Sequence, residues 1–117
     1  MSLDPTYTDP DKYVAIFENE WVRVLDYRDH PGQQTEPHGH PNSVMITLSD
    51  FQRRLSSSGN AADVSMTAGR AVWLPAQTHF GHNVGDTDTH VIFVELKASN
   101  SVDTAAGERN LGPSVGS

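Results

Sequence analysis

The sequence predicts an all-β domain, either a sandwich or a barrel, on three observations. Short runs rich in Val, Ile, Phe, Trp and Thr recur at intervals of about ten residues, turn residues separate them, and no helical hydrophobic period is present. A chain of 117 residues has room for a single domain. The expected strands cover residues 13–17, 21–27, 44–48, 51–55, 63–67, 71–74 and 90–96.

Turn signals and composition set the expected limits of the domain. Segments such as His30-Pro31-Gly32 and Ser58-Gly59-Asn60 carry the residues that turns require. Residues 1–11 have little to bury and predict an extended arm, and residues 99–117, rich in Gly and Ser, predict a flexible tail. The expected organisation is therefore an arm over 1–11, a barrel over 12–98 and a tail over 99–117.

The charge and the termini narrow the classes of partner. A net charge of -7 works against binding to nucleic acid or to an anionic membrane surface, and a small-molecule substrate or ligand is the expected partner. The N-terminus has no signal-peptide pattern, and no segment is apolar enough to span a membrane. We therefore expect a cytoplasmic protein. The chain has no cysteine, so the six histidines are the natural candidates for chemistry.

Two of these histidines share a short segment. His38 and His40 are separated by one residue, on a strand or at its entry. Side chains alternate across a strand, so both imidazoles should point to the same side. Two rings on one face can reach a common metal ion through nitrogen atoms. The alternative is a pair of solvated histidines in a loop.

Two segments together resemble the conserved motifs of the cupin superfamily. The first family motif reads G(x5)HxH(x3,4)E(x6)G, and Gly32, His38 and His40 match its start. The chain then departs from the pattern, because Val44 stands where the family usually has a glutamate ligand, and no glycine closes the motif.

The second family motif reads G(x5)PxG(x2)H(x3)N. Gly69, Pro75, His79 and Asn83 match it, although the spacing from proline to histidine is one residue shorter and Gln77 replaces the glycine. The resemblance covers about residues 20–97. It implies a cupin-type jelly-roll β-barrel of six to eight strands with the site inside.

The resemblance implies a divalent metal ion held by His38, His40 and His79. Iron is the first expectation for this metal, and manganese, nickel, zinc and copper are alternatives because imidazole suits several ions. Gln77 shares a strand face with His79 and is expected either as a weak fourth ligand or as a hydrogen-bond partner of a ligand. His82 should face away from His79, although Gly81 leaves a replacement of His79 by His82 open.

Three neutral nitrogen ligands leave the double positive charge on the ion, which favours an anionic or bidentate oxygen ligand. Three-histidine cupins include thiol and diketone dioxygenases. The resemblance therefore implies a dioxygenase-like enzyme, an oxidoreductase, acting on a small organic acid or diketone. The alternatives are a non-catalytic cupin that binds or senses a small molecule, and a degenerate barrel that has lost its metal and retains the histidines as hydrogen-bonded interior groups.

Other residues are candidates for the substrate pocket or for contacts between subunits. Alternation sends only one of Arg53 and Arg54 inward, and Arg53 is the expected partner for a substrate carboxylate. Trp73, Phe80 and Met45 are expected either as walls of the substrate pocket or as core residues, and Gln77 is expected beside the pocket walls. Glu36 could orient His38. The family resemblance also implies a homodimer in which the strand over 13–17 adds to the neighbouring barrel.

Overall fold

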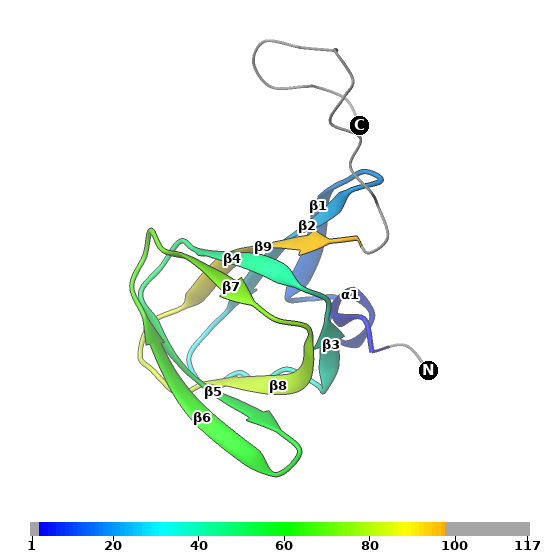
Figure 1. Ribbon diagram of the computed structural model, residues 1–117. Helices are drawn as coiled ribbons and strands as arrows, with labels where there is room; N and C mark the ends of the chain where they lie inside the picture. Colours follow the sequence, from blue (N-terminus) through cyan, green and yellow to red (C-terminus); the bar gives the residue numbers. More distant parts are fainter. Residues whose placement is uncertain (1–2, 98–117) are drawn as a thin grey trace.

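The computed structural model describes residues 3–97, which form one short helix and nine strands (Figure 1). The elements in chain order are α1 (Pro5–Thr8), β1 (Tyr13–Glu18), β2 (Val22–Asp29), β3 (His38–His40), β4 (Ser43–Thr47), β5 (Phe51–Ser57), β6 (Asn60–Met66), β7 (Ala71–Leu74), β8 (Gln77–Asn83) and β9 (Thr89–Leu96). The predicted all-β class is confirmed. No helix in the described part of the chain is long and apolar enough to cross a membrane.

The strands form two antiparallel sheets that face each other (Figure 1). One sheet has five strands in the order β1-β2-β9-β4-β7, and the other has four in the order β3-β8-β5-β6. Neighbouring strands in each sheet are mostly distant in sequence, since β2 pairs with β9 and β3 pairs with β8. This arrangement brings the two histidine segments together.

The core lies between the sheets and follows from the alternation of side chains along each strand. In β9, Val91, Phe93 and Glu95 are buried, and the residues between them are more exposed. Burial of the apolar members supplies most of the driving force for closing the sheets. The apolar core comprises Tyr13, Leu25, Tyr27, Phe51, Val91 and Phe93, with Met45, Met66 and Leu74 packed against it.

The N-terminal residues differ from the extended arm that the sequence predicts. Residues 5–8 form α1 instead, because Asp4 caps the helix by accepting a hydrogen bond from the Thr6 backbone N–H at 2.8 Å, and Pro5 occupies the first turn. Asp9 is only 4% exposed, and its carboxylate accepts a hydrogen bond from the Glu36 backbone N–H. This segment is therefore packed against the barrel near the first histidine pair. The predicted tail, 99–117, lies outside the described residues.

Candidate metal centre

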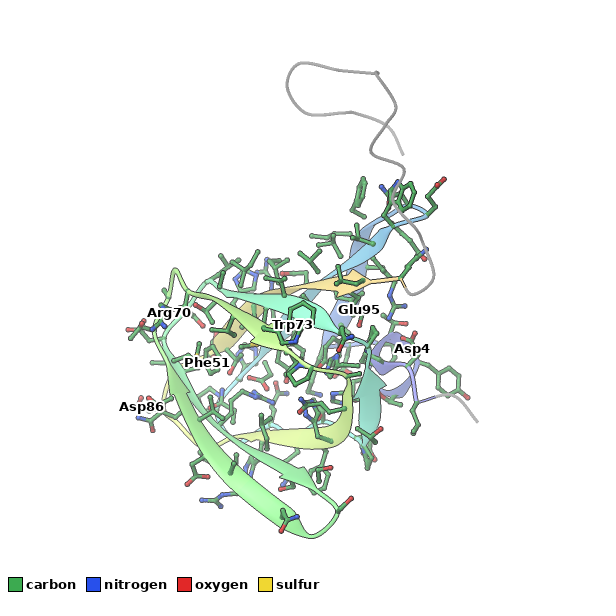
Figure 2. All side chains as sticks on the ribbon, viewed as in Figure 1. Asp4, Phe51, Arg70, Trp73, Asp86 and Glu95 are labelled. Atoms are coloured by element: carbon green, nitrogen blue, oxygen red, sulfur yellow. The ribbon has the colours of Figure 1, made fainter. Side chains whose placement is uncertain are left out.

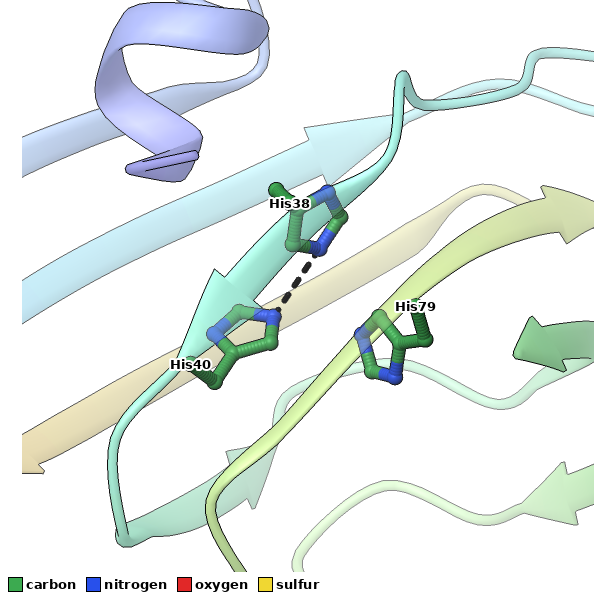
Figure 3. A group of neighbouring side chains, drawn as sticks. All are labelled: His38, His40 and His79. Atoms are coloured by element: carbon green, nitrogen blue, oxygen red, sulfur yellow. Dashed lines mark hydrogen bonds between the residues drawn. The ribbon is translucent and has the colours of Figure 1, made fainter. Parts of the chain in front are cut away.

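Three buried histidines converge on one point inside the barrel. His38 and His40 lie on the same face of β3, and the register of β3 with β8 places His79 directly opposite His38 (Figure 3). The ring centroids are 4.7 Å apart for His38 and His40, and 5.0 Å apart for each of the other two pairs. One ligand atom from each ring lies within 4.8 Å of the others, so the three together could hold a metal ion.

Hydrogen bonds at the back of two rings fix which nitrogen faces the centre. His38 Nδ1 lies 2.7 Å from the backbone carbonyl oxygen of Glu36, and His79 Nδ1 lies 2.7 Å from Oε1 of Gln77. A carbonyl oxygen can only accept, so in both rings Nδ1 carries the proton. The Gln77 amide is itself oriented by its Nε2, which donates to the carbonyl oxygen of Pro75 at 3.0 Å. In a neutral ring the remaining Nε2 then presents a lone pair to the centre.

Burial keeps two of these rings neutral. Burial, with the neighbouring His40, lowers the pKa of His38 to about 4, and burial with both other histidines lowers the pKa of His79 to about 3. Metal ligation requires the neutral imidazole, so no proton has to be removed from either ring near neutral pH. The two rings are ready for an ion over the whole physiological range.

The surroundings of the third ring, His40, show whether a metal ion fits the site. His40 Nε2 lies 3.0 Å from His38 Nε2, and the His40 ring stacks on Phe93 at 5.0 Å. On the other side, His40 Nδ1 and the Glu95 Oε2 3.8 Å from it are buried and have no hydrogen-bond partner. A cation bound by Nε2 of His40 would leave the proton on Nδ1, facing Glu95. The donor set therefore fits a divalent ion, with three nitrogen ligands and coordination positions left open.

A cavity of about 70 Å³ adjoins the histidines between the two sheets. Its walls are mainly apolar and aromatic, and His38, His79 and Arg53 are among the residues that line it. Tyr13 also lines it, with its hydroxyl 3.2 Å from His38 Nε2. Burial raises the pKa of the Tyr13 hydroxyl well above its ordinary value, so this group is a neutral phenol. The cavity could admit a few water molecules or one small ligand beside the metal centre.

The Arg53 guanidinium inside the barrel is already paired. Its Nη1 lies 2.5 Å from Asp29 Oδ2 and 3.2 Å from Thr89 Oγ1, and its Nη2 donates to the Tyr27 hydroxyl at 3.2 Å. Asp29 also accepts from the Tyr27 hydroxyl and from Asn83 Nδ2. This buried network largely neutralises the charge of Arg53.

Some of the other predicted site residues lie where the sequence predicts, and others do not. Arg53 points inward and Arg54 pairs with Asp63 at the surface, as alternation predicts. Met45 lines the cavity. By contrast, Trp73 and Phe80 are 55% and 36% exposed and are not among the lining residues, which corrects their expected placement as pocket walls.

The reason is strand parity. Leu74 and His79 point inward, so their neighbours Trp73 and Phe80 point outward. By the same rule Val44 lies on the outer face, opposite Trp73 and Val94, while Met45 occupies the inner face.

Two alternatives were open for Gln77 and two for His82, and the structure agrees with one in each case. Gln77 is the hydrogen-bond partner of His79, one of the two roles expected of it. His82 is partly buried, pairs with Arg54 in the sheet and is not a member of the histidine group. Glu36 orients His38 through its backbone carbonyl rather than through its side chain, which is exposed.

Glu95 and Asp9 are polar groups near the site that the sequence reasoning did not single out. Glu95 had a signal, because it continues the inward alternation of Val91 and Phe93 in a strand that should bury that face. An acidic residue at such a position needs a partner, and here the partners are Arg23 and His40. Asp9, whose Oδ2 lies 3.9 Å from His38 Nδ1, had no signal, since its position depends on the fold of 3–11.

Comparisons with known proteins agree with this architecture. No protein-family model matches the chain, and no curated protein matches it in sequence. Solved structures do match. A cupin domain from Bordetella pertussis Tohama I superposes with a TM-score of 0.69 at 25% identity, over 74% of this chain and 92% of that one.

Two further structures are similar in fold. An uncharacterized conserved protein with a double-stranded β-helix domain from Klebsiella pneumoniae has a TM-score of 0.59 at 20% identity, over 75% of this chain and 79% of that one. A predicted oxalate decarboxylase from Thermotoga maritima has a TM-score of 0.51 at 18% identity, over 73% and 79%. The two facing sheets, the inward histidines and these matches identify the chain as a small jelly-roll protein of the cupin superfamily.

Proposed function

We propose that this cupin is a metal-dependent enzyme, dioxygenase-like, that acts on a small organic acid or diketone. The observation that carries the proposal is the convergence of three buried imidazoles, two of which, His38 and His79, line an apolar cavity. A purely structural ion is usually closed off by four protein ligands, whereas three ligands beside a cavity leave space for a substrate.

His38, His40 and His79 would hold the metal through Nε2. The ion, with iron as the first expectation, would supply a positive charge that binds an oxygen ligand of the substrate and the redox chemistry of oxygenation. The protein residues would perform the other tasks. Glu36 and Gln77 hold two of the rings in the ligating tautomer, and the apolar walls would contact the apolar part of a substrate.

The surroundings of the cavity restrict the substrate class. Its volume of about 70 Å³ suits a compact molecule. Arg53 lines the cavity, but its contact with Asp29 leaves little net positive charge for a second substrate carboxylate. The arrangement therefore favours a substrate with one anionic oxygen group at the metal and an apolar remainder, such as an enolisable diketone or a monocarboxylic acid. In this proposal Arg53 binds substrate as a hydrogen-bond donor rather than as an unpaired cation.

A second candidate is a barrel that binds or senses a small molecule without turnover, or that has lost its metal. The specific observation in its favour is that Tyr13 and His40 both lie within hydrogen-bond distance of His38 Nε2. These contacts give His38 Nε2 hydrogen-bond partners without an ion. Metal analysis separates the metal-free barrel from the metal-dependent enzyme and from a binding protein that uses the metal.

The homodimer expected from the sequence remains a proposal. β1 forms one edge of the five-stranded sheet, so its outer side is the natural place for a strand of a second chain to add. Light scattering of the full chain would test it, and a monomer across the working concentration range would contradict it.

Oxygen uptake by the iron-loaded protein tests the catalytic proposal. A panel of monocarboxylic acids, dicarboxylic acids and diketones would be offered in an oxygen electrode, with His79→Ala as the inactive variant. His82→Ala is the matched control, because His82 lies on the same strand but outside the histidine group. Uptake with one class that His79→Ala abolishes and His82→Ala retains would support the enzyme. Bound iron with no uptake across the panel would favour the binding protein instead.

A further inference from the structure

Glu95 is a buried carboxylate in which one oxygen is paired with Arg23 and the other faces His40. Its side chain is 4% exposed, and Oε1 accepts a hydrogen bond from Arg23 Nε at 2.8 Å. Oε2 has no hydrogen-bond partner and lies 3.8 Å from His40 Nδ1, which also lacks one. Two buried complementary atoms that face each other without a bond need an explanation.

The tautomer of His40 supplies that explanation. His38 Nδ1 donates to a backbone carbonyl, so His38 Nε2 carries a lone pair. Without a cation, the 3.0 Å contact between the two Nε2 atoms favours a neutral His40 with its proton on Nε2, whereas Glu95 favours the proton on Nδ1, so the two neighbours of His40 favour opposite tautomers. In the tautomer with the proton on Nε2, His40 Nδ1 is bare and faces the carboxylate oxygen of Glu95, which is unfavourable. Moving the proton to Nδ1 frees Nε2 for a metal and gives Glu95 a donor.

Glu95 also brings a negative charge close to the histidines, where the first motif lacks its usual glutamate. Val44, at the position of the family's glutamate, faces outward, and its neighbour Met45 brings no charge to the cavity. Glu95 approaches from β9, behind the His40 ring, and is not one of the three residues that could ligate the ion. A carboxylate in that position raises the basicity of the imidazole in front of it.

Arg23 anchors this carboxylate. It contacts Glu95 through Nε and Asp4 through Nη1 at 3.0 Å, so the guanidinium bridges the end of β9 to the cap of α1 (Glu95 and Asp4 are labelled in Figure 2). The bridge holds Glu95 Oε1 and leaves Oε2 directed toward His40. The side chain of Glu95 is therefore held by an ion pair rather than free to rotate away.

We propose that Glu95 is a positioning residue that sets His40 in the tautomer with its proton on Nδ1, so that Nε2 can bind the metal, and that it supplies the negative charge missing from the first motif. The role rests on the metal site proposed above. Glu95 acts through His40 and does not itself bind the ion.

Cobalt binding to the full chain tests this role, with Co²⁺ as the probe. Glu95→Gln keeps the shape of the side chain and removes its charge, and it should weaken Co²⁺ binding by about 10- to 100-fold and change the visible spectrum of the bound ion. Arg23→Gln is the matched control, since it breaks the same ion pair but keeps the carboxylate behind His40. It should lose less Co²⁺ affinity than Glu95→Gln, because the carboxylate is still present behind His40 even though its anchor is lost. Wild-type affinity in Glu95→Gln, or an equal loss in Arg23→Gln, would overturn the proposal.

A second readout needs no metal and separates this proposal from the metal site itself. In the chelated protein, ¹⁵N NMR of the imidazoles reports which nitrogen of His40 is protonated. Glu95→Gln should shift His40 toward the tautomer with the proton on Nε2, while His90, on the same strand and paired with Asp26, should not change. An unchanged His40 would refute the positioning role even if wild type binds Co²⁺. A shifted His40 in a protein that binds no metal would refute the metal site alone.

Discussion

Gln77 Oε1 accepts a hydrogen bond from His79 Nδ1 at 2.7 Å, across two residues of the same strand. The second motif of the cupin superfamily usually has a glycine at the position of Gln77, so this chain has placed a side-chain acceptor where the family has none. The Gln77 amide is held in turn by the Pro75 carbonyl, which prevents the amide from flipping. The result is a fixed ring orientation for His79.

Replacing Gln77 by Leu should weaken metal binding by about 10-fold, because His79 Nδ1 then loses its acceptor and the ring loses its preferred tautomer. Titration against a competing chelator would measure the change. Gln52→Leu is the control, since Gln52 is exposed on β5, away from the histidines. Equal affinity in the two variants would show that the Gln77 contact does not orient a ligand.

Arg53→Met should lower the free energy of unfolding by about 3 kcal/mol, because it leaves the Asp29 carboxylate buried without its cation. Arg54→Met should have no measurable effect, since its ion pair with Asp63 is exposed. Urea denaturation of the chelated proteins would compare the two. Similar midpoints for both variants would contradict a stabilising role for the interior ion pair.

Gly81→Ala should also destabilise the barrel, by about 1–3 kcal/mol, because the added Cβ would lie 2.5 Å from Arg53 Nη2 and push the guanidinium out of its network. Gly39→Ala, on β3, is the comparison, since its nearest contact of 3.6 Å is an ordinary one. Thermal melting should show a clear loss for the first variant and a small change for the second. The reverse order would mean that Arg53 moves away without cost.

The stability of the chelated protein should fall as the pH drops from 6.5 to 5. The folded pKa values of His38 and His79, about 4 and about 3, lie below the ordinary value of 6.5, so the unfolded chain binds protons first. Stability then decreases with falling pH by up to about 1.4 kcal/mol per unit for each such proton. A His38→Gln/His79→Gln variant should show a flatter profile by urea denaturation. Identical slopes would contradict the buried, neutral state of these rings.

Much of the fold was predictable because strand signals are local. All seven expected strands are present with small shifts at their ends, and residues 71–74 match without a shift. β8 was not found from apolar composition, because its inward residues are His79, Gly81 and Asn83 instead of aliphatic ones. Only the motif resemblance indicated it. The helix at 5–8 was missed because a four-residue turn depends on its cap and on packing, and not on a hydrophobic period.

The histidine group was predictable for the same reason, since alternation on one short strand and a motif on another select His38, His40 and His79. The role of Glu95 was not, because its partner His40 lies far away in sequence and the contact depends on the pairing of β9 with its neighbours. Trp73 and Phe80 were wrongly predicted from the type of their side chains. Their aromatic character suggested a pocket wall, but a shift of one residue in parity decides which face of a sheet a side chain occupies.

The most direct test of the central claim is the metal content of the purified full chain after loading and gel filtration, measured by elemental analysis for wild type, His38→Ala, His79→Ala and His30→Ala. His30 lies at the surface, paired with Asp88, and serves as the control. We expect about one equivalent of metal in wild type and His30→Ala and almost none in the other two. Equal metal content in all four proteins, or none in wild type, would contradict the three-histidine site.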